Sequence, residues 1–171
     1  AVLASPHAHA RIVSINLDAA RALRGVYLAV GGREFAESVG PMPTLSSPPI
    51  VQHCIAVDRV RHVGEPVAAV VAASRSIAED ALALIEVDYE LLPAVVDPEE
   101  AMAAEGDAVL HPERGSNVVH SSRHVWGPLD EAFSSAAHVV RRRFRWPRVS
   151  PQPIETSGAV VDYDRAEKKF T

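Results

Sequence analysis

The chain has 171 residues, of which 47% are hydrophobic and only 5% aromatic, and its formal net charge is −5. This length and composition predict one sizeable domain or two small ones, with a core of small and β-branched side chains. An acidic chain argues against a general nucleic-acid binder, and no apolar run approaches the roughly 20 residues that a membrane span requires.

Short elements are predicted near the start of the chain. Residues 11–16 and 26–30 have the apolar pattern of strands. Between them, the Ala-rich residues 17–23 predict a short helix, and Gly25 stands where a helix C-terminus often takes a left-handed residue. Residues 40–49 contain four prolines, which exclude a helix and predict an extended surface loop.

The next part of the chain is the most informative. Residues 50–57 are expected to form an edge strand. Gly64-Glu65-Pro66 predicts a turn, and Val67–Ala72 is an apolar run typical of a strand buried on both faces. Ser76 with Glu79 fits a capping box. The helix that follows has an apolar stripe of Ile77, Ala81, Leu84 and Ile85. A second strand at Val87–Glu90 gives the spacing of a βαβ-like crossover.

The second half of the chain predicts a connecting region and a second unit. Pro98 begins a short helix over residues 99–105, and another helix is predicted over 129–137. Strands are expected at 139–146 and 159–163. The polar residues 164–169 then form the loop of a hairpin. Only Phe170 and Thr171 follow this loop, so we expect the chain to be a piece of a longer protein.

Five arginines gather late in the chain. Residues 139–171 carry 8 basic and 4 acidic side chains, whereas residues 1–138 carry 9 and 18. The arginines alternate with Phe144 and Trp146, a composition that also suits single-stranded nucleic acid. They are Arg141, Arg142, Arg143, Arg145 and Arg148. A stand-alone anion or nucleic-acid binding module using the Arg141–Arg148 face is therefore an alternative hypothesis, while a face paired with acidic groups of a neighbour is favoured.

Several other residues are candidates for chemistry. His7 and His9 have a spacing suited to metal chelation, but no further ligands complete a zinc site, so hydrogen bonding or packing is favoured. Cys54 is expected to be an inert small hydrophobe, and a single cysteine gives no sign of an oxidising compartment. Glu65 is expected to accept hydrogen bonds from backbone or arginine groups, and Glu99-Glu100 to begin a solvated helix.

Six segments carry a family resemblance in matching order and spacing. They are Ser5–Ile12, Arg61–Ala68, Ala78–Ala81, Val87–Glu90 with Leu92–Val95, Trp126–Phe133 and Pro153–Val160. The first four resemble the α/β hammerhead domain of xanthine dehydrogenase and aldehyde oxidase relatives. The last two resemble the connector and opening strands of the molybdopterin-binding domain. Ile154-Glu155-Thr156 is similar to the large subunit of aerobic carbon monoxide dehydrogenases.

The resemblance implies an α+β fold: a hammerhead domain over residues 1–97, a connector over 98–127 and the incomplete beginning of the molybdopterin-binding domain over 128–171. It implies the large subunit of a molybdenum hydroxylase, an oxidoreductase that takes oxygen from water. Molybdenum-molybdopterin, in its cytosine dinucleotide form, would belong to that full-length subunit. The 171-residue segment alone is expected to be inactive and to bind none of these cofactors.

Partners and sites follow from the same resemblance. The implied partners are the remainder of the large subunit, a medium subunit with FAD and a small subunit with [2Fe-2S] clusters, without nucleic acid or a membrane span. A cytoplasmic location is expected, because the first residues show no secretory signal. No catalytic or metal-ligating residue is assigned. Gln152 and Glu155 are the nearest candidates for cofactor contact, with packing as the favoured role.

Overall fold

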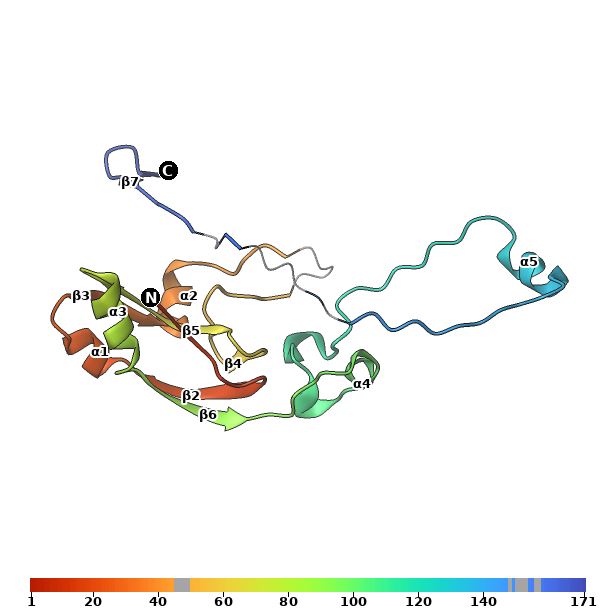
Figure 1. Ribbon diagram of the computed structural model, residues 1–171, viewed down its shortest axis with the longest axis horizontal. Helices are drawn as coiled ribbons and strands as arrows, with labels where there is room; N and C mark the ends of the chain where they lie inside the picture. The colour runs from red at the N-terminus through yellow and green to blue at the C-terminus, as the bar shows by residue number, and fades with distance from the viewer. Residues whose placement is uncertain (45–49, 148, 150–153, 156–157) are drawn as a thin grey trace. The chain divides into compact units, whose positions relative to one another are not determined.

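The computed structural model describes the chain except for residues 45–49, 148, 150–153 and 156–157. The chain divides into two compact units, Ala1–Arg123 and His124–Thr171. Figure 1 shows the elements of each unit. Both helices and strands occur, and the strands form small sheets, so the predicted α+β class is confirmed.

The first sheet of the first unit has β5 in its centre. It consists of β1 (Val2–Ala4), β5 (Pro66–Ala72) and β3 (Val26–Gly31) in that order, and both pairs are antiparallel. The apolar run predicted at residues 67–72 is therefore a central strand. Val67 is fully buried, but Val71 is 53% exposed, so the prediction that both faces are buried was wrong at Val71.

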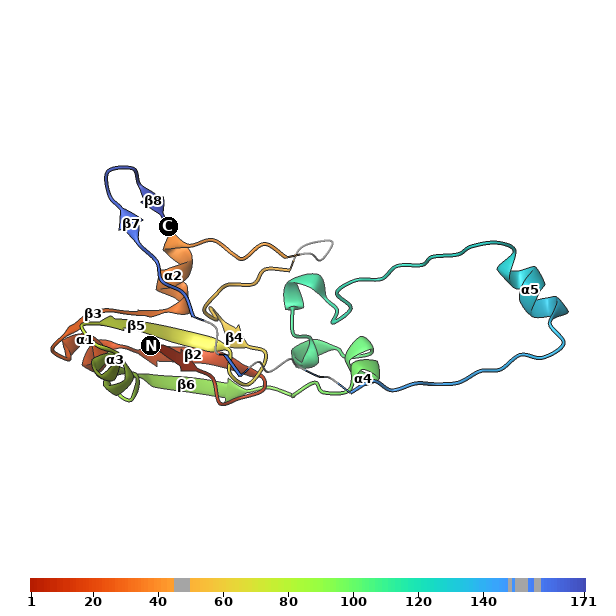
Figure 2. The same ribbon diagram turned by 45° about the horizontal axis from the view of Figure 1, so that its top comes forward.

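The second sheet is built around β2. Its order is β4 (Arg59–Val60), β2 (Ala10–Asn16) and β6 (Glu86–Leu91), again with antiparallel pairs. Figure 2 shows β2 and β6 running side by side along most of their length. The strand predicted at 11–16 is confirmed, and so is the strand predicted at 87–90.

Three helices belong to these sheets. They are α1 (Asp18–Ala22), α2 (Gly32–Ser38) and α3 (Arg75–Leu82). α3 packs against β5 and contributes Ala78 and Ala81 to the core. α1 and the positive φ of Gly25, 96°, agree with the predicted helix and its left-handed end. α2 was not predicted, because its sequence after Gly31-Gly32 lacks a long apolar stripe.

The core is made of small side chains, as the composition predicts. The described residues form two clusters, of which the first includes Ala20, Ala29, Ala68 and Val70. The second contains Ala10, Ile12, Ala56, Val60 and Val67. Alanine brings the backbones of neighbouring elements close together, which suits two small sheets covered by short helices.

Residues 98–123 are the part of the predicted connector (98–127) that belongs to the first unit, and we call them the connector segment. It contains α4 (Pro98–Met102) and two short 3-10 helices, η1 (Gly106–Ala108) and η2 (Pro112–Arg114). The Asp97 side chain caps α4 by accepting from the backbone N–H groups of Glu99 and Glu100. Both glutamates lie exposed in the first turn, which confirms the predicted solvated helix start.

The second unit has little regular structure. α5 (Leu129–Ser135) confirms the predicted helix but has no buried residue. β7 (Tyr163–Asp164) and β8 (Lys169–Phe170) form a two-stranded hairpin, in which the Tyr163 and Phe170 rings are 4.6 Å apart. The predicted hairpin loop at 164–169 is therefore present, with strands of two residues each.

The predicted βαβ-like crossover was wrong. β5 and β6 lie in different sheets, and every strand pair among the described residues is antiparallel. Spacing alone could not distinguish the two arrangements, because a helix of eight residues can return the chain to the same sheet or carry it to another.

Three predicted strands were also wrong. Residues 50–57 form no strand, and regular pairing begins at Arg59. The described residues of 139–146 and 159–162 have no strand either, and they lie exposed. Their apolar alternation indicates strand propensity, but a strand also needs a neighbour for its backbone groups.

The predicted capping box was misplaced by two residues. The N-cap of α3 is Ser74, whose side-chain oxygen accepts a hydrogen bond from Ile77 N–H at 3.3 Å. Ser76 lies inside the helix, where Glu79 instead pairs with Arg75 at 2.7 Å. Serine is favoured at an N-cap at either position, but only Ser76 has a glutamate three residues later, so the capping-box rule selected the wrong serine.

None of the helices formed by the described residues combines the length and apolar character that crossing a membrane takes.

Candidate functional site

Two arginines at β4 reach the connector segment. Arg59 begins β4 and Arg61 follows it, so their side chains point to the same side of an extended chain. Arg59 Nη1 donates to the carbonyl oxygen of Val109 at 3.2 Å, and Arg61 Nε donates to the carbonyl oxygen of Leu110 at 2.9 Å. We call these two side chains with their two acceptor carbonyls the arginine latch.

Arg59 is a buried cation, only 9% exposed. Its Nη1 also lies 3.5 Å from His9 Nε2. The ion pairs among the described residues do not include Arg59, so its charge is met by neutral acceptors. Burying a charge without a counter-ion is costly, and each acceptor that faces it therefore matters.

His9 is 2% exposed, and each nitrogen of its ring faces one polar partner. Its Nδ1 lies 2.8 Å from the carbonyl oxygen of Pro93, which can only accept. Nδ1 therefore carries the hydrogen, and Nε2 is left as the acceptor that faces Arg59. Burial lowers the pKa of His9, the charges of Arg59 and Arg61 lower it further, and the Pro93 hydrogen bond and Asp107 oppose this.

Arg61 connects the latch to the turn before β5. Its Nη1 donates to the carbonyl oxygen of Arg59 at 3.2 Å, and its backbone N–H donates to Glu65 Oε2. Glu65 Oε1 lies 3.9 Å from Arg61 Nη1. The prediction that Glu65 accepts hydrogen bonds from backbone or arginine groups is confirmed. Burial lowers the pKa of Arg61, opposed by the Glu65 and Glu113 carboxylates.

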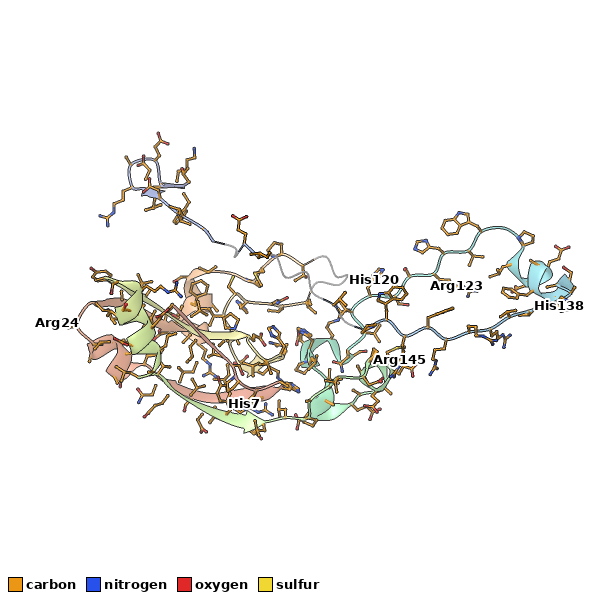
Figure 3. All side chains as sticks on the ribbon, in the orientation of Figure 1. His7, Arg24, His120, Arg123, His138 and Arg145 are labelled. Atoms are coloured by element: carbon orange, nitrogen blue, oxygen red, sulfur yellow. The ribbon has the colours of Figure 1, made fainter. Side chains whose placement is uncertain are left out.

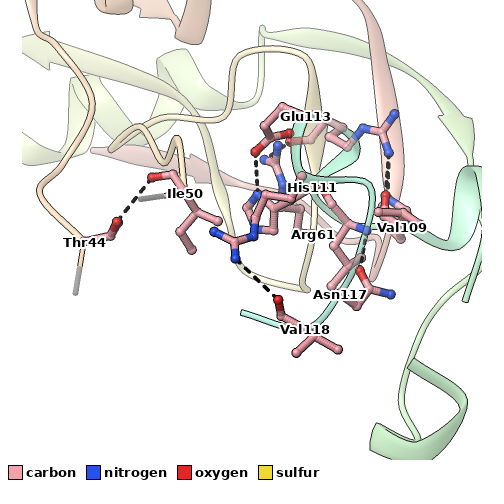
Figure 4. Close-up of polar contacts among 12 residues, drawn as sticks. Thr44, Ile50, Arg61, Val109, His111, Glu113, Asn117 and Val118 are labelled. Atoms are coloured by element: carbon pink, nitrogen blue, oxygen red, sulfur yellow. Dashed lines mark hydrogen bonds and ion pairs between the residues drawn. The ribbon is translucent and has the colours of Figure 1, made fainter. Parts of the chain in front are cut away.

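Asn117 ties the connector segment together behind the latch. Its Oδ1 accepts from the Leu110 N–H at 2.8 Å. Its Nδ2 donates to the carbonyl oxygens of Ala101 and Ala108, at 3.2 and 3.0 Å. The backbone of Leu110 is therefore bound at its carbonyl oxygen by Arg61 and at its N–H by Asn117, and Figure 4 shows the surroundings of these two side chains.

His111 and Glu113 form a second pair beside Arg61. Their Nδ1 and Oε1 atoms are 3.1 Å apart (Figure 4). Burial lowers the pKa of His111, and the charge of Arg61 adds to this while Glu113 opposes it. Burial alone would raise the pKa of Glu113, but its own backbone hydrogen bond and His111 lower it.

A pocket of about 270 Å³ lies next to Arg61 and Glu65. His53, Asp58 and Glu113 also line it. Among the described residues, the buried Nδ1 of His53 has no hydrogen-bond partner. The wall of the pocket thus carries three carboxylates and one arginine, beside apolar side chains.

The two histidines singled out in the sequence have separate partners. The His7 ring meets the edge of the Tyr89 ring, with centroids 4.8 Å apart, and His9 is bound by Pro93 and Arg59. Their predicted hydrogen-bonding and packing roles are confirmed. Nowhere in the described part of the chain do three His, Cys, Asp or Glu side chains gather as a metal site would require.

Other predicted residues lie at the surface. Cys54 is a free and exposed cysteine, and its expected inertness stays a prediction. Glu155 is exposed, and Gln152 lies outside the described residues. In Figure 3, Arg145 lies on an extended stretch of the second unit, where no strand forms. The arginine face expected of a strand is therefore absent from the described residues, and Arg148 lies outside them.

Sequence reasoning missed Arg59, His53 and Asn117 as site residues. Arg59 and Arg61 flank the fully buried Val60, and this polar–apolar–polar pattern at a strand indicates two arginines on one face. It does not indicate which carbonyls they bind. For Asn117, a loop of Gly, Ser and Asn gives no signal that distinguishes an amide bonded to the backbone from one that is solvated.

Comparison with known proteins gives two family matches. The sequence model described as "Aldehyde oxidase and xanthine dehydrogenase, a/b hammerhead domain" matches residues 1–93. The model of the molybdopterin cofactor-binding domain matches residues 110–171. Arg61, in the first match, therefore binds Leu110, the first residue of the second match, whereas Val109, bound by Arg59, lies between the two matches.

Individual relatives agree with these matches. The nicotine 6-hydroxylase large subunit of Paenarthrobacter nicotinovorans is 37% identical over 97% of this chain and 21% of its own length. The carbon monoxide dehydrogenase large chain of Afipia carboxidovorans is 36% identical over 98% of this chain and 22% of its own. The chain thus spans about a fifth of the length of these relatives.

A solved structure shows the same fold. Quinoline 2-oxidoreductase from Pseudomonas putida superposes with a TM-score of 0.84 at 42% identity, over 99% of this chain and 22% of that one. None of these comparisons supports a nucleic-acid binding module.

Proposed function

The chain belongs to the aldehyde oxidase and xanthine dehydrogenase family, and from this we propose that it is part of the large subunit of a molybdenum-dependent hydroxylase. Its role in that subunit is structural: the hammerhead fold supports the cofactor-binding domain and contacts other chains. The 171 residues alone would be inactive. Two relatives with the words "large subunit" or "large chain" in their names support this.

The arginine latch is the observation that carries the structural role. The hammerhead match ends at residue 93 and the cofactor-binding match begins at residue 110. Arg59 and Arg61, which lie in the first match, bind the carbonyls of Val109 and Leu110. A support for the cofactor domain needs a fixed connection at this place, and the buried guanidinium group of Arg59 with the partly buried one of Arg61 supplies it.

The proposed cofactor is molybdenum-molybdopterin, in its cytosine dinucleotide form. When bound, it supplies the oxidation in which a hydroxyl oxygen comes from water. The proposal assigns the metal to the rest of the full-length subunit. Gln152 and Glu155, within the cofactor-binding match, stay the nearest candidates for cofactor contact.

Partners and domain limits belong to the same proposal. We propose a medium subunit with FAD and a small subunit with [2Fe-2S] clusters, in the cytoplasm. A relative described as the gamma subunit of the 6-hydroxypseudooxynicotine dehydrogenase complex supports a multi-subunit assembly. The proposed limits remain residues 1–97 for the hammerhead domain, 98–127 for the connector and 128–171 for the start of the cofactor domain.

The test is an activity assay of the complete complex, purified through a tag on the subunit that carries these residues. The substrate panel follows the names of the relatives: nicotine, quinoline, xanthine, an aldehyde and carbon monoxide. We expect oxidation of one class with an artificial electron acceptor, and transfer of labelled oxygen from water to the product. A complex that contains the cofactors but oxidises none of these compounds would contradict the proposed reaction.

A further inference from the structure

The latch is built so that each arginine depends on a different neighbour. Arg61 lies beside the carboxylates of Glu65 and Glu113, which oppose the cost of burying its charge. Arg59 has no such carboxylate among the described residues and relies on Val109 and on the neutral ring of His9. The state of the His9 ring therefore decides how well Arg59 is accommodated.

The two protonation states of His9 present different groups to Arg59. In the neutral ring, the Nε2 lone pair faces Arg59 Nη1 at 3.5 Å. A proton on Nε2 would replace that acceptor by an N–H donor and place two positive charges together inside the protein. Arg61 adds a third charge nearby, and Asp107 on η1 is the acidic group that partly offsets it.

We propose that neutral His9 is a positioning residue that keeps the arginine latch closed, so that acidification releases residues 109–117 from β4 and the residues that follow it. The first step is loss of the Arg59 contact to Val109, because Arg59 moves away from the charged ring. The backbone of Leu110 then loses the fixed place that Arg61 gives its carbonyl oxygen and Asn117 gives its N–H. The consequence for the cofactor-binding segment rests on the proposed function; the latch itself does not.

Hydrogen exchange on the complete subunit, followed by mass spectrometry, measures the latch directly. The peptides to follow cover residues 106–118, and their rates are corrected for the intrinsic effect of pH. Arg59→Ala and Arg61→Ala are expected to reduce protection of these peptides about tenfold or more at neutral pH, since each removes a charged hydrogen bond. Arg33→Ala is the matched control, because Arg33 is an exposed arginine that pairs with Asp58 at 3.5 Å and takes no part in the latch.

A second set of variants tests His9. In the natural protein, protection of residues 106–118 should fall about tenfold between neutral pH and one unit below the pKa of His9. His9→Gln replaces the imidazole by an amide, which can donate and accept hydrogen bonds but cannot ionise. This substitution should remove most of the fall in protection. His62→Gln, at an exposed histidine next to Arg61, should leave this fall in protection unchanged. His111→Gln should leave the fall largely intact, although His111 also faces Arg61.

The outcomes separate the claims. Unchanged protection in both arginine variants would overturn the latch. A pH profile that His9→Gln leaves as it was, or that His111→Gln abolishes, would overturn the role of His9. Peptides of β2 and β6 report whether a variant is folded, and the glutamine variant gives a result even where an alanine variant unfolds. Absence of molybdenum from the complex would refute the proposed function but leave these exchange results valid.

Discussion

Arg59 Nη1 lies 3.5 Å from His9 Nε2, inside the first unit and fifty positions apart along the chain. His9 belongs to the turn before β2, and Arg59 to β4, which pairs with β2. The contact therefore depends on that strand pairing. Through Arg59 it reaches Val109, so three distant parts of the chain meet at one buried cation.

Stability is expected to fall on the acidic side of neutrality. The pKa values of His9 and His111 are both lowered from 6.5 in the folded chain, so the unfolded chain takes up protons first. Their contribution is fully present above pH 6.5 and is lost as the pH falls toward the folded pKa values. Urea unfolding at several pH values measures this. A free energy of unfolding that stays constant or rises from pH 7 to pH 5 would contradict it.

Val67 and Val71 give a matched pair within β5. Val67 is fully buried, whereas Val71 is 53% exposed. Val67→Ala should lower the free energy of unfolding by about 2 kcal/mol, because it removes buried methyl groups and leaves a cavity. Val71→Ala should change it by less than about 0.5 kcal/mol. Equal effects of the two substitutions would contradict this difference in burial between the start and the end of β5.

Gly32 is required by its surroundings. A Cβ at this position would lie 1.9 Å from the carbonyl oxygen of Ala56, which is backbone and cannot rotate away. Gly32→Ala should therefore cost about 1–3 kcal/mol of stability. Gly40→Ala is the control, since a Cβ there meets nothing within 4 Å. Thermal unfolding of both variants tests the prediction, and a Gly32 variant as stable as the control would refute the close approach.

The N-cap of α3 can be tested with its two serines. Ser74→Ala should destabilise the chain by about 1 kcal/mol, because the Ile77 N–H loses its side-chain acceptor. Ser76→Ala, inside the helix, should be close to neutral or slightly stabilising, since alanine is the better helix former. The reverse order in denaturant unfolding would restore the capping box predicted at Ser76.

Local signals in the sequence predicted the elements that depend on local chemistry. Gly25 has the positive φ angle predicted for a helix end, Gly64 lies in the predicted turn, and β2, β3, α1 and β6 lie close to their predicted positions. These elements follow from turn residues and from apolar periodicity. The family resemblance, read from separated motifs, is also confirmed by the matches over residues 1–93 and 110–171.

Long-range relationships were not accessible in the same way. β6 lies in the second sheet because it pairs with β2. The sequence of β5, α3 and β6 contains no pattern that predicts this pairing. The partners of Arg59 lie at positions 9 and 109, so the latch emerges only once both sheets are formed. The exposed residues 139–146 show the opposite case: a strand pattern without a neighbouring strand.

The most direct test of the account is the molybdenum content of the complete subunit that carries this chain, purified with its partners and measured by elemental mass spectrometry. Membership in a molybdenum hydroxylase predicts molybdenum in a fixed proportion to the subunit, together with the nucleotide released from its molybdopterin. A folded, intact complex without molybdenum, obtained from cells that fill other molybdenum enzymes, would contradict the proposed function.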